Sequence, residues 1–139
     1  MSLAGRLLVI DDSEVVLERV KTRLERESYE VSTTSQPARA ARDLFLCDLV
    51  ILDYHMPAMN GAEVLRSLKL LGASSGASPL YFLYTSDKVL SRGYRELGFD
   101  GALINKGNDE SLVQQVAVAL RLAKLRRKAG AANTTVPRR

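Results

Sequence analysis

The sequence predicts an α/β fold in which helices cover both faces of a five-stranded parallel sheet, a doubly wound arrangement. Three observations predict it. Short, uninterrupted apolar runs are typical of strands that are buried on both faces. The segments between the runs carry apolar residues at helical spacing. Strand-type and helix-type segments also alternate five times along the chain, an order that favours right-handed crossovers between parallel strands.

The predicted strands follow from two kinds of pattern. Continuous apolar runs predict four buried strands, at residues 7–10, 49–52, 80–84 and 102–104. A fifth segment, residues 29–34, instead alternates Tyr29, Val31 and Thr33 with more polar side chains. Such alternation is typical of a strand with one exposed face, so we expect it at an edge of the sheet.

Five helices are predicted, one after each strand. Their apolar positions are Val16, Val20 and Leu24; Ala38, Ala41, Leu44 and Phe45; Val64, Leu65, Leu68 and Leu71; Val89, Leu90, Tyr94 and Leu97; and Leu112, Val113, Val116, Ala117, Leu120 and Ala123. Pro37 suits the first turn of the second helix, where its missing N–H is not needed. Residues 72–78, which are rich in Gly and Ser, predict a loop of unusual flexibility.

The last helix has a second apolar face, formed by Val118, Leu122 and Leu125, which points well away from its core-facing stripe. A second apolar face needs a second partner, which could be another copy of the chain or a following output module; exposed residues without a partner are the alternative. Lys124 and Arg127 occupy the core-facing stripe further on, so we expect the helix to leave the core there.

Length and composition predict one domain with a basic end. The 139 residues suit a single domain, for which we expect the bounds 5–125. Residues 126–139 are expected to be a structureless basic tail or the start of a linker, because residues 120–139 hold seven basic residues and no acid. That segment is too short for a recognition element, so direct nucleic-acid binding is not expected.

The rest of the composition argues for a cytoplasmic protein. No apolar run approaches the roughly 20 residues that span a membrane, and the N-terminus lacks the pattern of a secretory signal. The single cysteine, Cys47, cannot form an internal disulfide, and we expect it to be a buried, reduced thiol.

Polar side chains follow the predicted strands where ligands bind in an open α/β sheet, at the carboxyl ends. Asp11 and Asp12 follow the first strand, Asp53 the third, Thr85 the fourth and Lys106 the fifth. Three carboxylates at one rim repel one another unless a cation compensates. Mg²⁺ is the natural occupant, and an ammonium and a hydroxyl beside it suit a transferred phosphoryl group.

These positions resemble a response-regulator receiver domain, the phosphoacceptor module of two-component signalling. The match lies in the runs Leu7-Leu8-Val9-Ile10-Asp11-Asp12, Leu52-Asp53-Tyr54-His55-Met56-Pro57-Ala58-Met59-Asn60-Gly61 and Tyr84-Thr85-Ser86, and in Lys106. The resemblance implies a flavodoxin-like sheet of strand order 2-1-3-4-5. It also gives Gly61 the role of permitting a turn before a helix that starts near Ala62.

The resemblance also implies the roles of the acidic residues. Asp53 would attack the phosphorus of a phosphohistidine on a sensor histidine kinase or phosphotransfer protein and become an acyl phosphate. Asp12 would bind Mg²⁺ directly, Asp11 mainly through water, and the backbone carbonyl of His55 would complete the protein ligands. The His55 side chain is expected to line the site and tune hydrolysis of the phosphoryl group.

Two further roles concern the switch. Lys106 would pair with Asp53 at rest and with the phosphoryl group afterwards, and Thr85 would donate its hydroxyl to a phosphoryl oxygen. That donation would pull the loop after the fourth strand inward and change protein–protein contacts. A homodimer or partner is expected on the face of the fourth helix, fifth strand and fifth helix, which contains Tyr94, Val118 and Leu122.

Three departures from the family pattern bear on that output. Gly107 stands where the family usually has a proline, Leu103 where it commonly has an aromatic residue, and Ser86 where Ala is frequent. The site around Lys106 is therefore expected to be differently placed, and the usual aromatic switch is missing.

Two other function classes compete with this one. An Asp-nucleophile phosphatase would need a second carboxylate two residues after the nucleophile, where this chain has His55. We therefore expect a signalling phosphoacceptor that assists only its own phosphorylation and dephosphorylation. The alternative is a receiver-like scaffold that binds partners without being phosphorylated.

Overall fold

The protein is described by a computed structural model covering residues 5–76 and 78–134. It contains one five-stranded sheet with all neighbouring strands parallel, in the order β2-β1-β3-β4-β5, which confirms the predicted fold class and strand order. Its strands are β1 (Gly5–Ile10), β2 (Tyr29–Thr34), β3 (Leu49–Leu52), β4 (Leu80–Tyr84) and β5 (Gly101–Leu103). Its helices are α1 (Glu14–Glu25), a 3-10 turn at Pro37–Arg39, α2 (Ala41–Leu44), α3 (Gly61–Ser75), α4 (Lys88–Arg92) and α5 (Asp109–Thr134).

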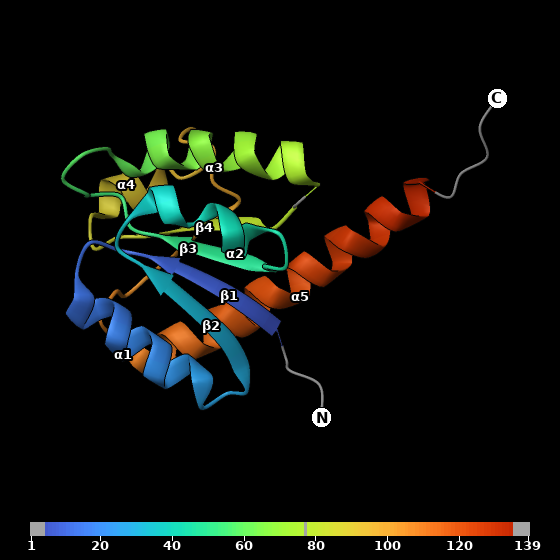
Figure 1. The fold of residues 1–139 in the computed structure, drawn as a ribbon. Helices are drawn as coiled ribbons and strands as arrows, with labels where there is room; N and C mark the ends of the chain where they lie inside the picture. The colour runs from blue at the N-terminus through green and yellow to red at the C-terminus, as the bar shows by residue number, and fades with distance from the viewer. Residues whose placement is uncertain (1–4, 77, 135–139) are drawn as a thin grey trace.

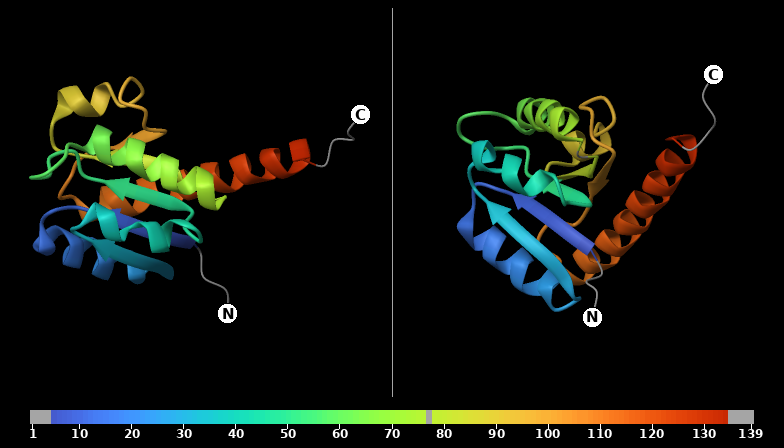
Figure 2. Two further views of the ribbon diagram at one scale, coloured as in Figure 1. Left: turned by 45° about the horizontal axis from the view of Figure 1, so that its top comes forward. Right: turned by 45° about the vertical axis from the view of Figure 1, so that its right-hand side comes forward.

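Two hydrophobic layers hold the sheet. Helices α1 and α5 cover one face, and α2, α3 and α4 cover the other (Figures 1 and 2). Successive strand residues point to opposite layers, as the pleat requires: Leu7 and Val9 pack under α1 and α5, whereas Leu8 and Ile10 pack on the other side. The central strands β3 and β4 are buried throughout, which explains their uninterrupted apolar sequence. β2 lies at the edge, as its alternation predicts.

Three helix predictions need correction. The loop predicted over 72–78 is wrong for its first part, because Gly72 is buried and α3 continues to Ser75. Gly76, with a φ of 80°, then ends the helix. The fourth helix, expected to extend to Leu97, ends at Arg92, and Gly93 caps it. In the second helix Phe45 is exposed rather than packed, because α2 has ended before it.

The last strand and last helix also differ from expectation. β5 spans Gly101–Leu103 rather than 102–104, because the backbone of Ile104 pairs with a side chain of α5 instead of with β4. In α5 the buried stripe contains Ala119, while Ala117 is only half-buried. The prediction that the chain is structureless from 126 is wrong up to Thr134, where α5 ends.

Polar contacts hold α5 at the edge of the sheet, beyond which the helix continues (Figure 1). Arg126 contacts Asp100 at 3.4 Å and donates to the carbonyl of Pro79 at 2.9 Å. Arg127 pairs with Asp48. These contacts tie the helix to the amino-terminal ends of the strands after its buried stripe has ended at Ala123. Residues 135–139 of the predicted tail lie outside the described residues. Over the described part of the chain, every helix is too short or too polar to cross a bilayer.

Candidate functional site

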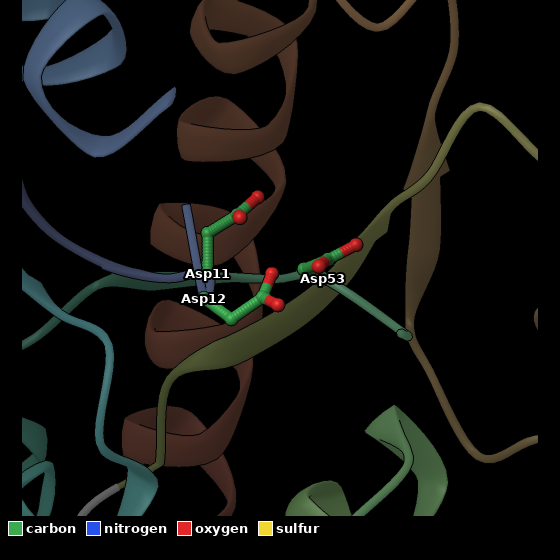
Figure 3. Close-up of side chains that lie close together, drawn as sticks. All are labelled: Asp11, Asp12 and Asp53. Carbon is green, nitrogen blue, oxygen red and sulfur yellow. The ribbon is translucent and has the colours of Figure 1, made fainter. Parts of the chain in front are cut away.

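The predicted acidic residues meet at the carboxyl ends of two adjacent strands. Asp11 and Asp12 directly follow β1, and Asp53 directly follows β3 (Figure 3). The backbone N–H of Asp53 donates to the carbonyl of Ile10 at 2.9 Å, so the pairing of the two strands continues into the site. One carboxylate oxygen from each of the three acids lies within 4.8 Å of the others.

The three carboxylates differ in burial. Asp11 and Asp53 are buried, and Asp12 is exposed. Asp11 accepts a hydrogen bond from the backbone N–H of Ser13 at 2.9 Å, which orients it, while Ser13 also caps the start of α1. The arrangement leaves Asp12 open to solvent beside two carboxylates that the protein holds in place.

Lys106 reaches this cluster from the loop between β5 and α5. Its ammonium donates to Asp11 at 2.9 Å, to Asp53 at 3.2 Å and to the backbone carbonyl of Tyr84 at 3.3 Å. All three donor positions of the ammonium are therefore used. The expectation that Lys106 lies by Asp53 matches this geometry; the direct bond to Asp11 was not expected.

The electrostatics of the cluster favour a further cation. Burial raises the pKa of Asp53 above its usual range, and the attraction of Lys106 only partly offsets this effect. Burial alone would lower the pKa of Lys106, but its hydrogen bonds and charge pairing with Asp11 and Asp53 outweigh burial and raise it. Three carboxylates and one ammonium leave a net charge of about −2 when all are ionised, which is poorly stabilised in a partly buried site.

A divalent cation fits this donor set. Oxygen ligands lie about 2.0–2.1 Å from Mg²⁺, so neighbouring ligands of one ion are about 3–4 Å apart. The carboxylate separations extend to 4.8 Å, which small side-chain movements or a bridging water accommodate. The charge of the ion would balance the excess charge of the cluster. Asp11, Asp12 and Asp53 are therefore the side chains that could hold Mg²⁺.

Thr85 directly follows β4, and its hydroxyl faces the turn after that strand. It is buried, and its Oγ1 accepts a hydrogen bond from the backbone N–H of Asp87 at 3.1 Å. The neighbouring Ser86 is exposed. A cavity of about 460 Å³ opens beyond Thr85, and its charged lining consists of Lys88, Arg92 and Lys106. Thr85 thus shares the lining of this cavity with Lys106, which also contacts Asp11 and Asp53.

His55 lies on the surface of the loop that follows β3. Its ring stacks edge-on against Tyr54 at 5.2 Å, and its Nε2 is 3.9 Å from a carboxylate oxygen of Asp87. The side chain is 67% exposed, and its predicted role in lining the site stays a prediction. The predicted metal-binding role of the His55 carbonyl stays a prediction.

Gly61 lets the backbone of the same loop pack closely against the start of α3, which the sequence alone did not predict. It is the first residue of α3, not part of a turn before it, so the expectation is wrong in this respect. Its N–H donates to the carbonyl of Tyr54 at 2.7 Å. A Cβ at this position would come within 2.8 Å of the Tyr54 Cα and 3.0 Å of the Asp53 carbonyl oxygen. Glycine is needed here for close approach, and Asn60 and Glu63 fix the helix start by a capping box.

Sequence reasoning missed Tyr84 as part of this site. The apolar pattern places it as the last residue of a strand, and the motif that contains it assigns it no role, yet its side chain is buried next to Lys106. A usable signal was present: a buried tyrosine hydroxyl needs a hydrogen-bond partner, and Tyr84 directly precedes Thr85.

Comparisons with known sequences agree with this arrangement. A family model described as the response regulator receiver domain matches residues 7–117. The transcriptional regulatory protein CpxR homolog of Haemophilus influenzae is 31% identical over 119 residues, which cover 84% of this chain and 51% of that protein. Response regulator PleD of Caulobacter vibrioides is 42% identical over 71 residues, which cover 48% of this chain and 15% of that protein. The chain thus spans about half or less of the length of these two relatives.

Solved structures show the same fold at lower identity. A receiver domain from Clostridium thermocellum is 24% identical, with a TM-score of 0.72 over 90% of this chain and 98% of that one. A CheY-like receiver domain protein from Methanospirillum hungatei is 22% identical, with a TM-score of 0.74 over 90% of this chain and 99% of that one.

Proposed function

The chain belongs to the response regulator receiver domain family, and from that premise we propose that it is a signalling switch phosphorylated on Asp53. The observation that carries the proposal is the position of the Asp53 carboxylate. It lies 3.2 Å from the Lys106 ammonium and within one cluster with Asp11 and Asp12. This arrangement supplies a nucleophile, a cation for the phosphoryl oxygens and carboxylates for a metal ion.

The proposed reaction moves one phosphoryl group. A carboxylate oxygen of Asp53 attacks the phosphorus of a phosphohistidine on a sensor histidine kinase or phosphotransfer protein. The new bond is O–P and the bond that breaks is P–N, so the histidine leaves and an acyl phosphate remains. Bound Mg²⁺ would neutralise charge on the transferring group. The chain contributes position and charge, because the donor already carries an activated phosphoryl group.

Lys106 and Thr85 respond to the new group. In the proposed switch, Lys106 exchanges its contact with the Asp53 carboxylate for one with a phosphoryl oxygen. Thr85 gives up its hydrogen bond with the N–H of Asp87 and donates to another phosphoryl oxygen. The turn after β4 then moves towards the site. Since α4 begins directly after this turn, the movement changes the surface around α4.

That surface is the proposed contact site for partners. Its exposed apolar residues come from three elements: Val89 of α4, Ile104 after β5, and Val118, Leu122 and Leu125 of α5. We propose that a second copy of the chain binds this surface. The proposed location of the protein is the cytoplasm. Sedimentation with and without beryllofluoride tests it: a larger species with the phosphoryl mimic is expected, and Leu122→Lys should remove it. Monomers under both conditions would contradict the homodimer.

Phosphorylation itself is tested with a small phosphodonor. Acetyl phosphate and Mg²⁺ should add one phosphoryl group to the wild-type chain by intact mass and none to Asp53→Asn. Asp48→Asn is a matched control, because Asp48 lies at the opposite ends of the strands, and it should be labelled normally. No labelling of a folded wild-type chain would favour the alternative, a scaffold that binds partners without phosphorylation. Labelling of Asp53→Asn would refute the assignment of the acceptor.

A further inference from the structure

The loop that carries Lys106 has an unusual backbone. Asn105 and Gly107, on either side of Lys106, have φ values of 59° and 101°. Left-handed conformations are costly for most residues, but Asn and Gly adopt them readily, so the residues on either side of Lys106 permit this sharply turned loop. A Cβ on Gly107 would meet no atom within 4 Å, so the glycine serves the backbone conformation rather than a close contact.

One end of this loop is held by α5. The side-chain amide of Gln115 accepts from the N–H of Ile104 at 2.8 Å and donates to its carbonyl at 2.9 Å. These two bonds replace the pairing that another strand residue would make. They fix the backbone two residues before Lys106, and a bond from the Asn108 N–H to the Asn105 carbonyl at 3.0 Å closes the turn that contains it.

The other end is held by Tyr84 of β4. The Tyr84 hydroxyl accepts a hydrogen bond from the N–H of Gly107 at 3.4 Å. The Tyr84 ring lies 5.1 Å from the Lys106 ammonium, and the Tyr84 carbonyl accepts from that ammonium at 3.3 Å. A single residue therefore contacts both the backbone of the loop and the head of the lysine. Tyr84 is itself fixed, since only 1% of its surface is exposed.

We propose that Tyr84 is a positioning residue for Lys106: it holds the lysine loop at Gly107 and keeps the ammonium against Asp53. This inference rests on the proposed function, in which Lys106 binds the phosphoryl group. A flexible lysine stem loses much freedom when its head is fixed, so a rigid support makes the productive position more populated. Substitution of a tyrosine that only packs in the core would change the stability of the fold but not the position or mobility of the Lys106 ammonium.

The test removes the hydroxyl alone. Tyr84→Phe keeps the ring and the carbonyl and loses the bond to Gly107. We expect phosphorylation by acetyl phosphate with Mg²⁺ to slow about threefold to tenfold, as for loss of one hydrogen bond, while the unfolding midpoint falls only modestly, by what the same bond contributes to the folded state. Tyr81→Phe is the matched control: Tyr81 is a buried tyrosine of the same strand that packs in the opposite layer. It should leave the rate unchanged.

A double-mutant cycle separates positioning from core packing. If Tyr84 acts through Lys106, Tyr84→Phe should have no further effect on the residual rate of Lys106→Ala. The same fold-loss in both backgrounds, or no loss in the wild-type background, would overturn the proposal.

A second readout does not depend on phosphorylation. In ¹⁵N NMR of the Lys106 ammonium, Tyr84→Phe should lower the order parameter and Tyr81→Phe should not. If the wild-type chain is not labelled, the proposed function fails while this measurement still decides the role of Tyr84. An unchanged order parameter in Tyr84→Phe would refute it.

Discussion

The substitution Gly61→Ala tests how tightly the loop after Asp53 is packed against α3. Two effects of opposite sign compete. Alanine favours a helix over glycine by up to about 1 kcal/mol. Against this, the new Cβ would lie 2.8 Å from the Tyr54 Cα, whereas carbon atoms prefer about 3.5–4.0 Å. The Tyr54 backbone cannot simply retreat, because its carbonyl accepts from the Gly61 N–H at 2.7 Å.

The clash should win. Overpacking of this kind costs about 1–3 kcal/mol, so Gly61→Ala should lower the free energy of unfolding by up to about 2 kcal/mol after the full gain in helix propensity of about 1 kcal/mol. Urea denaturation measures the loss as a lower midpoint with an unchanged m-value. Because the same Cβ would press on the Asp53 carbonyl at 3.0 Å, phosphorylation should also slow.

Gly93→Ala is the matched control for this prediction. Gly93 has a φ of −90°, which alanine adopts, and the nearest atom to its new Cβ would be the Val89 carbonyl oxygen at 3.5 Å. That variant should be neutral or slightly more stable than the wild type. If Gly61→Ala proves as stable as Gly93→Ala, the packing argument for this loop is wrong.

Three other predictions follow from charge and burial. Burial raises the pKa of Asp53, so stability is lost as the pH rises from the unfolded-state pKa through the higher folded-state pKa, and the loss is complete above it. Asp53→Asn should therefore raise the melting temperature of the metal-free protein at neutral pH, and a lower melting temperature would contradict this. Mg²⁺ at about ten times its dissociation constant should stabilise the wild type by about 1.4 kcal/mol and the Asp53→Asn variant far less. Equal shifts in the thermal unfolding of the two proteins would argue against a Mg²⁺ site that includes Asp53. Burial raises the pKa of the Cys47 thiol to about 12, so a thiol reagent at pH 8 should modify the native protein at least about a hundredfold more slowly than the urea-unfolded chain; similar rates would show an accessible thiolate.

The fold could be predicted because its main signals are local. Uninterrupted apolar runs marked β3 and β4 to the residue, and alternation marked β2. The errors fall where distant contacts override local preference. Glycine and serine suggested a loop at 72–75, but burial of Gly72 keeps α3 helical. Arg126 and Arg127 suggested a solvated tail, but Asp100 and Asp48 hold them against the domain.

The site could be predicted as a set of residues, but not as a set of contacts. The carboxyl ends of parallel strands necessarily share one edge of the sheet, which brings Asp11, Asp12 and Asp53 together. Which partner each group chooses depends on the loops. The bond from Lys106 to Asp11 and the support from Tyr84 depend on a backbone with two left-handed residues, and no local pattern specifies that shape.

The most direct test of the central claim identifies the modified atom. An acyl phosphate on an aspartate is reduced by borohydride to homoserine, whereas phosphoesters and phosphoramidates are not. Protein treated with acetyl phosphate and Mg²⁺ should, after reduction and peptide mapping, contain homoserine at position 53 and at no other aspartate. Homoserine at Asp11 or Asp12, or a stable phosphoryl group that borohydride leaves intact, would contradict the account.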